Sequence, residues 1–177
     1  MKYTIWDRVV GLFHWSVAAL FLLNFWLFEA GEALHENVGY AVAALLAVRI
    51  IWGFCGSSHA RFANFWPTPT RLKRYIQHPE TRHPLAAGHN PLGALMVFLM
   101  LFLLALVAFS GWLQETDSYW GELWPQLLHE WSANLLMAAV VVHVAAVIYI
   151  EQRSGVALVQ PMITGERCEK VKREKLC

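Results

Sequence analysis

The sequence is short of charged residues and lacks several functional motifs, and each absence narrows what the protein can be. Only 15% of its 177 residues are charged, whereas a soluble domain carries about 25%. None of its three cysteines belongs to a C-x-x-C-H motif, so covalent attachment of a c-type haem is not expected. We find no internal repeat, no glycine-rich phosphate loop and no nucleic-acid-binding signature. Nucleic acid is therefore not an expected partner.

Apolar residues are abundant and fall into four blocks. They make up 57% of the chain, and the blocks cover approximately residues 9–28, 38–55, 91–113 and 133–150. Each block is near the length of about 20 residues that crosses a bilayer as a helix. A soluble four-helix bundle is the alternative, but FLLNFWLF and LMVFLMLFLLALVAF lack the polar stripe of a soluble helix. The pattern predicts an all-α, integral membrane four-helix bundle.

The first block is expected to remain in the protein as a membrane helix. It carries His14, Ser16 and Asn24 and ends in an acidic stretch. A secretory signal would instead end at a cleavage site of small residues.

Charges between the blocks predict the orientation. Every Lys and Arg except Arg49 lies in the N-terminus, in the connection between the second and third blocks, or in the C-terminal tail. The two opposite connections carry seven acidic residues and no Lys or Arg: Glu29, Glu32, Glu36, Glu115, Asp117, Glu122 and Glu130. The positive-inside rule places both termini in the cytoplasm. The three cysteines then lie on the reducing side of the membrane.

The chain divides into a membrane domain and a tail. Residues 1–155 are predicted to form the four-helix domain, with a cytoplasmic loop over 56–88. Within that loop, residues 69–77 predict a short amphipathic helix suited to the membrane surface. Residues 156–177 form a basic cytoplasmic tail, and we expect its closing charge run, CEKVKREKLC, to be solvated, partly disordered and attracted to anionic lipid.

The last helix is predicted over residues 127–150, LLHEWSANLLMAAVVVHVAAVIYI, and its two histidines share one helix face. His129 and His143 stand 14 residues apart, which on a helix is about 21 Å. Fourteen steps of about 100° return to within about 40° of the starting direction, so both rings leave the same side. Imidazoles stacked along an apolar helix suggest two metal centres, one near each side of the membrane.

The predicted topology pairs these histidines with two others by depth. His14 and His143 both lie toward the cytoplasmic side and are called the inner pair; His35 and His129 lie toward the opposite side and are called the outer pair. Neutral imidazole suits iron, and two histidines on facing helices can hold a haem between them. Two matched pairs favour two haems with two histidine ligands each. Structural or proton-relay histidines are the alternative.

Two further residues are candidates for cofactor binding. Arg49 lies within the second block, where a charge is costly unless it pairs or reaches the interface. It could neutralise haem propionates, or extend its side chain to the membrane surface. His89 precedes the third block. It could replace an inner ligand, take part in hydrogen bonding at a quinone site, or be a plain surface residue.

Several short segments together resemble the bacterial cytochrome b561 superfamily, most closely the b-type cytochrome subunits of nickel–iron hydrogenases. The segments are WDR at 6–8, FHW at 13–15, LHENVGY at 34–40, RIIWG at 49–53, ARF at 60–62, GHNPLG at 88–93, and LHE at 128–130 with His143. They span residues 6 to about 150. Each is weak alone, but together they are specific for the superfamily.

The resemblance implies a four-helix cytochrome of the bacterial inner membrane with two b haems. It assigns ligation to His14, His35, His129 and His143, in agreement with the depth argument. It also implies electron exchange with the quinone pool. The partner on the periplasmic side is expected to be a c-type cytochrome, another haem protein or hydrogenase subunits.

The sequence leaves other roles open. A stand-alone enzyme of this superfamily could act on superoxide or ferric ions at the outer haem. That enzyme is the alternative to the main interpretation, which is an electron-transfer cytochrome acting alone or as a subunit of an oxidoreductase complex. Whether it forms a homodimer is also left open.

Overall fold

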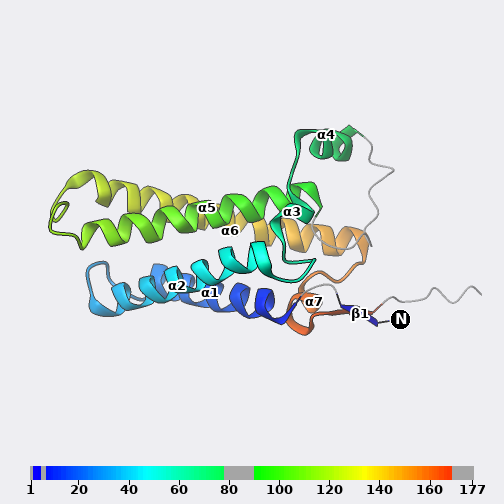
Figure 1. Ribbon diagram of the computed structural model, residues 1–177, viewed down its shortest axis with the longest axis horizontal. Helices are drawn as coiled ribbons and strands as arrows, with labels where there is room; N and C mark the ends of the chain where they lie inside the picture. Colours follow the sequence, from blue (N-terminus) through cyan, green and yellow to red (C-terminus); the bar gives the residue numbers. More distant parts are fainter. Residues whose placement is uncertain (1, 5–6, 78–89, 169–177) are drawn as a thin grey trace, which may run out of the picture.

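Four long helices dominate the computed structural model, which describes residues 2–4, 7–77 and 90–168 (Figure 1). They are α1 (Arg8–Trp26), α2 (Ala33–Cys55), α5 (Pro91–Gln114) and α6 (Leu123–Ser154). Shorter elements are β1 (Lys2–Thr4), α3 (Phe62–Phe65), α4 (Pro69–Gln77), α7 (Val159–Thr164) and β2 (Glu166–Cys168). All four long helices are long and apolar enough to cross a membrane. The predicted all-α, four-helix membrane fold is confirmed, with a small two-stranded ribbon added.

The helix starts follow local capping chemistry. Asn90 accepts a hydrogen bond from the backbone N–H of Gly93 at 2.6 Å, and Pro91 takes the first helical position, where its missing N–H costs nothing. The start of the third membrane helix was predicted from these residues and is confirmed. Asp7 caps α1 in the same way, accepting from the N–H of Val10 at 2.8 Å.

α6 is longer than its apolar block predicted. It spans 32 residues and begins at Leu123, ten residues before its apolar block and four residues before the predicted helix of 127–150. Its first turn contains Pro125, at a position where the backbone N–H has no partner inside the helix anyway. Proline therefore does not prevent the helix from starting before it, and His129 lies well inside α6.

The long helices form two antiparallel hairpins. α1 and α2 make one hairpin, α5 and α6 make the other, and α2 contacts α5 between them (Figure 1). The two acidic connections lie at one end of the bundle, on the left in Figure 1, whereas β1, α3, α4 and α7 lie at the other. The predicted sorting of connections between two ends is confirmed. Which end faces the cytoplasm stays a prediction.

An apolar layer fills the middle of the bundle. Its buried residues come from all four long helices: Phe21, Val42, Leu46, Leu103, Leu104, Leu136 and Ala139. Many large apolar side chains point outward instead, among them Leu12, Phe54 and Phe102, each at least 60% exposed. Such a surface suits contact with lipid tails, for which no hydrophobic penalty applies.

The first part of the tail packs against the start of the chain. β2 pairs antiparallel with β1, with Tyr3 opposite Arg167. In α7, Pro161 is fully buried, and the Met162 carbonyl would lie 3.1 Å from a Cβ at Gly11 of α1. The apolar segment VALVQPMI thus lies against the start of α1. The charge run that we expect to be solvated lies, apart from Cys168, outside the described residues.

Asp7 ties the start of α1 to the end of α2. Its carboxylate accepts hydrogen bonds from the Trp52 indole N–H at 2.8 Å and the Ser57 hydroxyl at 2.5 Å. Burial acts to raise the pKa of Asp7, but the hydrogen bonds from Ser57, Trp52 and the Val10 N–H, with the charge of Arg49, hold that pKa below its ordinary value.

Replacing this carboxylate should destabilise the fold in a pH-dependent way. Asp7→Ala removes a helix cap and two side-chain hydrogen bonds, a loss of about 1–3 kcal/mol. Because the folded pKa of Asp7 is lowered, its contribution is fully present above the ordinary aspartate pKa and is lost as the pH falls through the folded pKa. Wild type and variant should differ most near neutral pH and converge in strongly acidic buffer.

Thermal unfolding in detergent micelles measures this difference. Asp117→Ala is the matched control, because Asp117 is an exposed aspartate in the opposite connection. An equal fall in midpoint temperature for both variants would contradict the role of Asp7.

Candidate functional site

The structure brings the predicted inner pair together. The ring centroids of His14 on α1 and His143 on α6 lie 6.3 Å apart, with the ring planes inclined by 60°. Trp15 packs edge-on against the His14 ring at 5.0 Å. The Nδ1 atom of His14 is buried without a hydrogen-bond partner in the described part of the chain.

The outer pair has nearly the same geometry. His35 on α2 and His129 on α6 have ring centroids 6.0 Å apart and planes inclined by 63°. Asn24 of α1 donates its side-chain N–H to the His35 carbonyl at 3.2 Å, which links the two helices beside the pair. Depth therefore predicted both partnerships correctly.

Both spacings suit two imidazoles that share one iron. Imidazoles bound to one metal through bonds of about 2 Å would have ring centroids about 6 Å apart. Among residues 7–77 and 90–168, no three His, Cys, Asp or Glu side chains gather into a metal site. Two imidazoles alone are an incomplete set for a free ion, but they complete a haem iron, whose porphyrin supplies the remaining ligands. The donor set therefore fits haem.

A cavity of about 260 Å³ opens beside the outer pair. Both rings of the pair line it, and apolar residues of α1, α2 and α5 form most of its wall. Small residues lie on two sides, with Gly39 on α2 and Ala108 and Gly111 on α5. Small residues let a flat ring system approach the helix backbones, so the cavity has the character expected of a haem pocket.

Two carboxylates lie at the edge of this cavity. Glu36 of α2 and Glu115, which follows α5, both line it. Burial raises the pKa of Glu115, and the charge and a hydrogen bond of Glu36 raise it further. The outer pair thus has acidic neighbours.

His129 is held more firmly than the other ligand candidates. Its Nδ1 lies 3.0 Å from the Val107 carbonyl and 3.3 Å from the Ser110 hydroxyl, both on α5. The Nδ1 of His35, across the outer pair, has no hydrogen-bond partner in the described chain. The contact with α5 was missed by sequence reasoning, because no residue pattern marks a carbonyl acceptor on another helix.

Arg49 is buried beneath the loop that follows α2. Only 3% of its side chain is exposed. One guanidinium nitrogen, Nη2, donates to the Ala60 carbonyl at 3.3 Å, and the group lies 4.7 Å from the centre of the Phe62 ring. Its other nitrogen, Nη1, is buried without a partner among the described residues. A buried cation with a free donor is suited to an anionic group.

Loop packing explains why Arg49 stays inside. Phe62 covers Gly53 so closely that a Cβ at Gly53 would lie 2.1 Å from the ring. Arg61 donates to the Gly56 carbonyl at 2.8 Å and closes the loop over the end of α2. His89, the remaining predicted site residue, lies outside the described residues.

Comparison with known proteins gives one family. The profile of the family described as prokaryotic cytochrome b561 matches residues 5–165. That range contains both histidine pairs and Arg49. No solved structure matches the chain significantly.

Two relatives carry the same name, probable Ni/Fe-hydrogenase B-type cytochrome subunit. The protein from Bradyrhizobium diazoefficiens is 26% identical over 160 residues, which cover 75% of this chain and 64% of that relative. The protein from Rhizobium leguminosarum bv. viciae is 23% identical over an aligned length of 210. The alignment takes in 92% of this chain and 87% of that relative. The chain thus spans less than two thirds of the first relative's length.

Proposed function

The chain belongs to the prokaryotic cytochrome b561 family, and from that premise we propose that it is a dihaem electron-transfer cytochrome. It would carry electrons between the quinone pool and a redox partner on the periplasmic side of the bacterial inner membrane. The observation that carries the proposal is the presence of two imidazole pairs, with centroids 6.3 and 6.0 Å apart, toward opposite ends of one bundle. Bound haem b supplies a one-electron redox couple at each pair.

The protein's part is to hold and shield these groups. α6 supplies one ligand to each pair, while α1 and α2 supply the other two. The apolar layer between the pairs, which includes Leu104 and Leu136, excludes water from the middle of the bundle. Burial and ligand identity are the means by which a protein sets the potential of a haem.

Arg49 is proposed to bind an anionic group of the inner haem. Its unpartnered Nη1 supports this role, because an uncompensated buried donor costs free energy until an acceptor arrives. The propionates are the only anionic groups that haem b presents. His89 is proposed to serve a quinone site.

The electron partner is proposed to be a hydrogenase. Both relatives are named as hydrogenase cytochrome subunits, which favours this partner over a c-type cytochrome or another haem protein. The outer pair would face it, since the connections beside that pair carry the acidic residues and no Lys or Arg. The names of the two relatives likewise favour an electron-transfer subunit over a stand-alone superoxide or ferric reductase.

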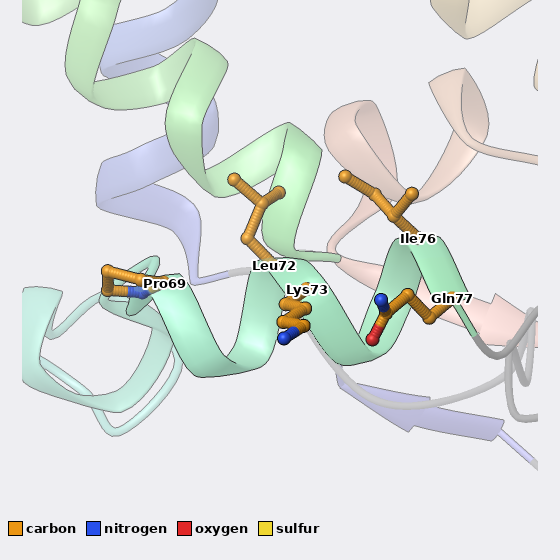
Figure 2. A pocket seen from close by; sticks show the side chains of 5 residues that line it. All are labelled: Pro69, Leu72, Lys73, Ile76 and Gln77. Atoms are coloured by element: carbon orange, nitrogen blue, oxygen red, sulfur yellow. The ribbon is translucent and has the colours of Figure 1, made fainter.

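α4 is proposed to lie on the membrane surface. The structure forms this helix over the predicted residues, Pro69–Gln77. Figure 2 shows Leu72 and Ile76 extending from the same side of the helix, with Lys73 directed elsewhere. α4 carries three cations and no acidic residue, which suits anionic headgroups above apolar lipid tails.

Spin labels should report the position of α4. In a cysteine-free background reconstituted in nanodiscs, a label at Ile76→Cys is expected to be reached by oxygen and protected from a water-soluble nickel chelate. A label at Arg74→Cys serves as the control and should show the reverse preference. Equal access of the nickel chelate to both sites would contradict a surface-bound helix.

Haem content tests the main proposal. Pyridine haemochrome quantification and reduced-minus-oxidised spectra should give two b haems per wild-type chain. His14→Ala and His129→Ala should each lose at least one, because each removes an iron ligand. His59→Ala is the control, since this loop histidine belongs to neither pair. Full haem content in His129→Ala would refute the assignment.

Removing the buried cation should affect only one haem. Arg49→Met is expected to lower the midpoint potential or the occupancy of the inner haem. The reason is that a nearby positive charge favours the reduced iron and binds the propionate. Arg49→Lys keeps the positive charge, so its inner-haem potential and occupancy should lie closer to those of wild type. Arg153→Met, an exposed arginine at the end of α6, is the control. Potentiometric titration measures both haems, and unchanged potentials with full occupancy in Arg49→Met would contradict the role.

A further inference from the structure

His129 has one tautomer imposed by its neighbour on α5. Its Nδ1 lies 3.0 Å from the Val107 carbonyl oxygen, which can only accept a hydrogen bond. Nδ1 must therefore carry the proton and donate it. The other ring nitrogen, Nε2, is left with its lone pair free, as an iron ligand requires.

Ser110 supplies a second acceptor for the same proton. This residue is fully buried, and its hydroxyl lies 2.6 Å from the Leu106 carbonyl, 3.2 Å from the Val107 carbonyl and 3.3 Å from His129 Nδ1. The shortest contact identifies Leu106 as the acceptor of the hydroxyl proton. The lone pairs of the Ser110 oxygen are then available to the Nδ1–H of His129.

Gly111 allows this approach. A Cβ at Gly111 would lie 3.3 Å from Cε1 and 3.4 Å from Nδ1 of the His129 ring. With a side chain at this position, the His129 ring would have to shift by a few tenths of an ångström. Three features of α5, namely the Val107 carbonyl, the Ser110 hydroxyl and the missing side chain at Gly111, together form a cradle for the His129 ring.

The cradle is not repeated at the neighbouring ligands. Nδ1 of His14 and Nδ1 of His35 are buried and have no hydrogen-bond partner in the described residues. His129 is thus distinguished from its partner His35 and from His14 at the other end. A hydrogen bond to the far nitrogen of a metal-bound imidazole fixes the ring and makes it a stronger electron donor.

We propose that Ser110 is a positioning residue that, with the Val107 carbonyl and Gly111, orients His129 and lowers the reduction potential of the outer haem. The inference rests on the proposed dihaem function. A more electron-rich imidazole stabilises ferric over ferrous iron, so the effect of Ser110 has a defined sign. The residue acts through His129 and does not itself touch the haem iron.

Redox titration of the purified holoprotein tests this. Ser110→Ala should retain two haems and raise one of the two midpoint potentials, leaving the other in place. Ser132→Ala is the matched control: Ser132 is only 2% exposed, and its hydroxyl donates to the His129 backbone carbonyl at 3.1 Å. The Ser132→Ala substitution therefore removes a buried serine hydroxyl beside His129 without changing the contacts of the His129 ring.

The outcomes separate the inference from the function on which it rests. If Ser110→Ala and Ser132→Ala both retain two haems and show the same two midpoint potentials, the role of Ser110 is overturned and the dihaem proposal stays intact. Fewer than two haems in wild type would overturn both. Where Ser110→Ala does not retain haem, nitrogen-15 NMR of the haem-free protein decides. A changed His129 Nδ1 signal relative to Ser132→Ala supports the role, and an unchanged signal overturns it.

Discussion

Close packing of α5 against α6 is the contact on which the outer half of the site depends. A hydrogen bond to its far nitrogen holds a histidine ligand in one orientation, and inside a membrane there is no water to supply that bond. At His129 the partner comes from the backbone of α5, which Gly111 allows to approach. Because α6 also carries His143, the packing that orients one ligand fixes the helix that bears a second.

The end of the bundle beside the inner pair is organised by a different means. Asp7 joins the start of α1 to Trp52 and Ser57, while the loop that follows α2 folds over Arg49. Buried charge is tolerated here because hydrogen bonds and the Phe62 ring surround it. The docked α7 adds a cover over the start of α1, three residues before His14. The two ends are therefore held together by different interactions, through buried charges and a loop at one end and through helix-to-helix contact at the other.

Sequence reasoning predicted the features that depend on periodicity and depth. The number of helices, the cap at Asn90 and the extent of α4 follow from local residue choices, and the structure confirms them. The pairing of the four histidines followed from spacing along antiparallel helices. Contacts that depend on packing between helices could not be predicted, since neither Ser110 nor Trp52 differs in pattern from an ordinary helical residue. The start of α6 was predicted four residues too late, at Leu127, because Pro125 and the polar residues before it obscured the apolar pattern.

Buried polar side chains in the bundle differ in whether they have hydrogen-bond partners. Burying a polar side chain in an apolar bundle is unfavourable unless something compensates it. Compensation is visible for Asp7, His129 and Ser110. It is incomplete for His14, His35 and Arg49, because each has a buried nitrogen with no hydrogen-bond partner among the described residues. Those three residues lie with the histidine pairs or on the helix that supplies one ligand, while the layer between the pairs is apolar. In the described part of the chain, the buried nitrogens without partners thus belong to one histidine of each pair and to Arg49, so unsatisfied polar groups lie at the two ends where cofactors are proposed to bind.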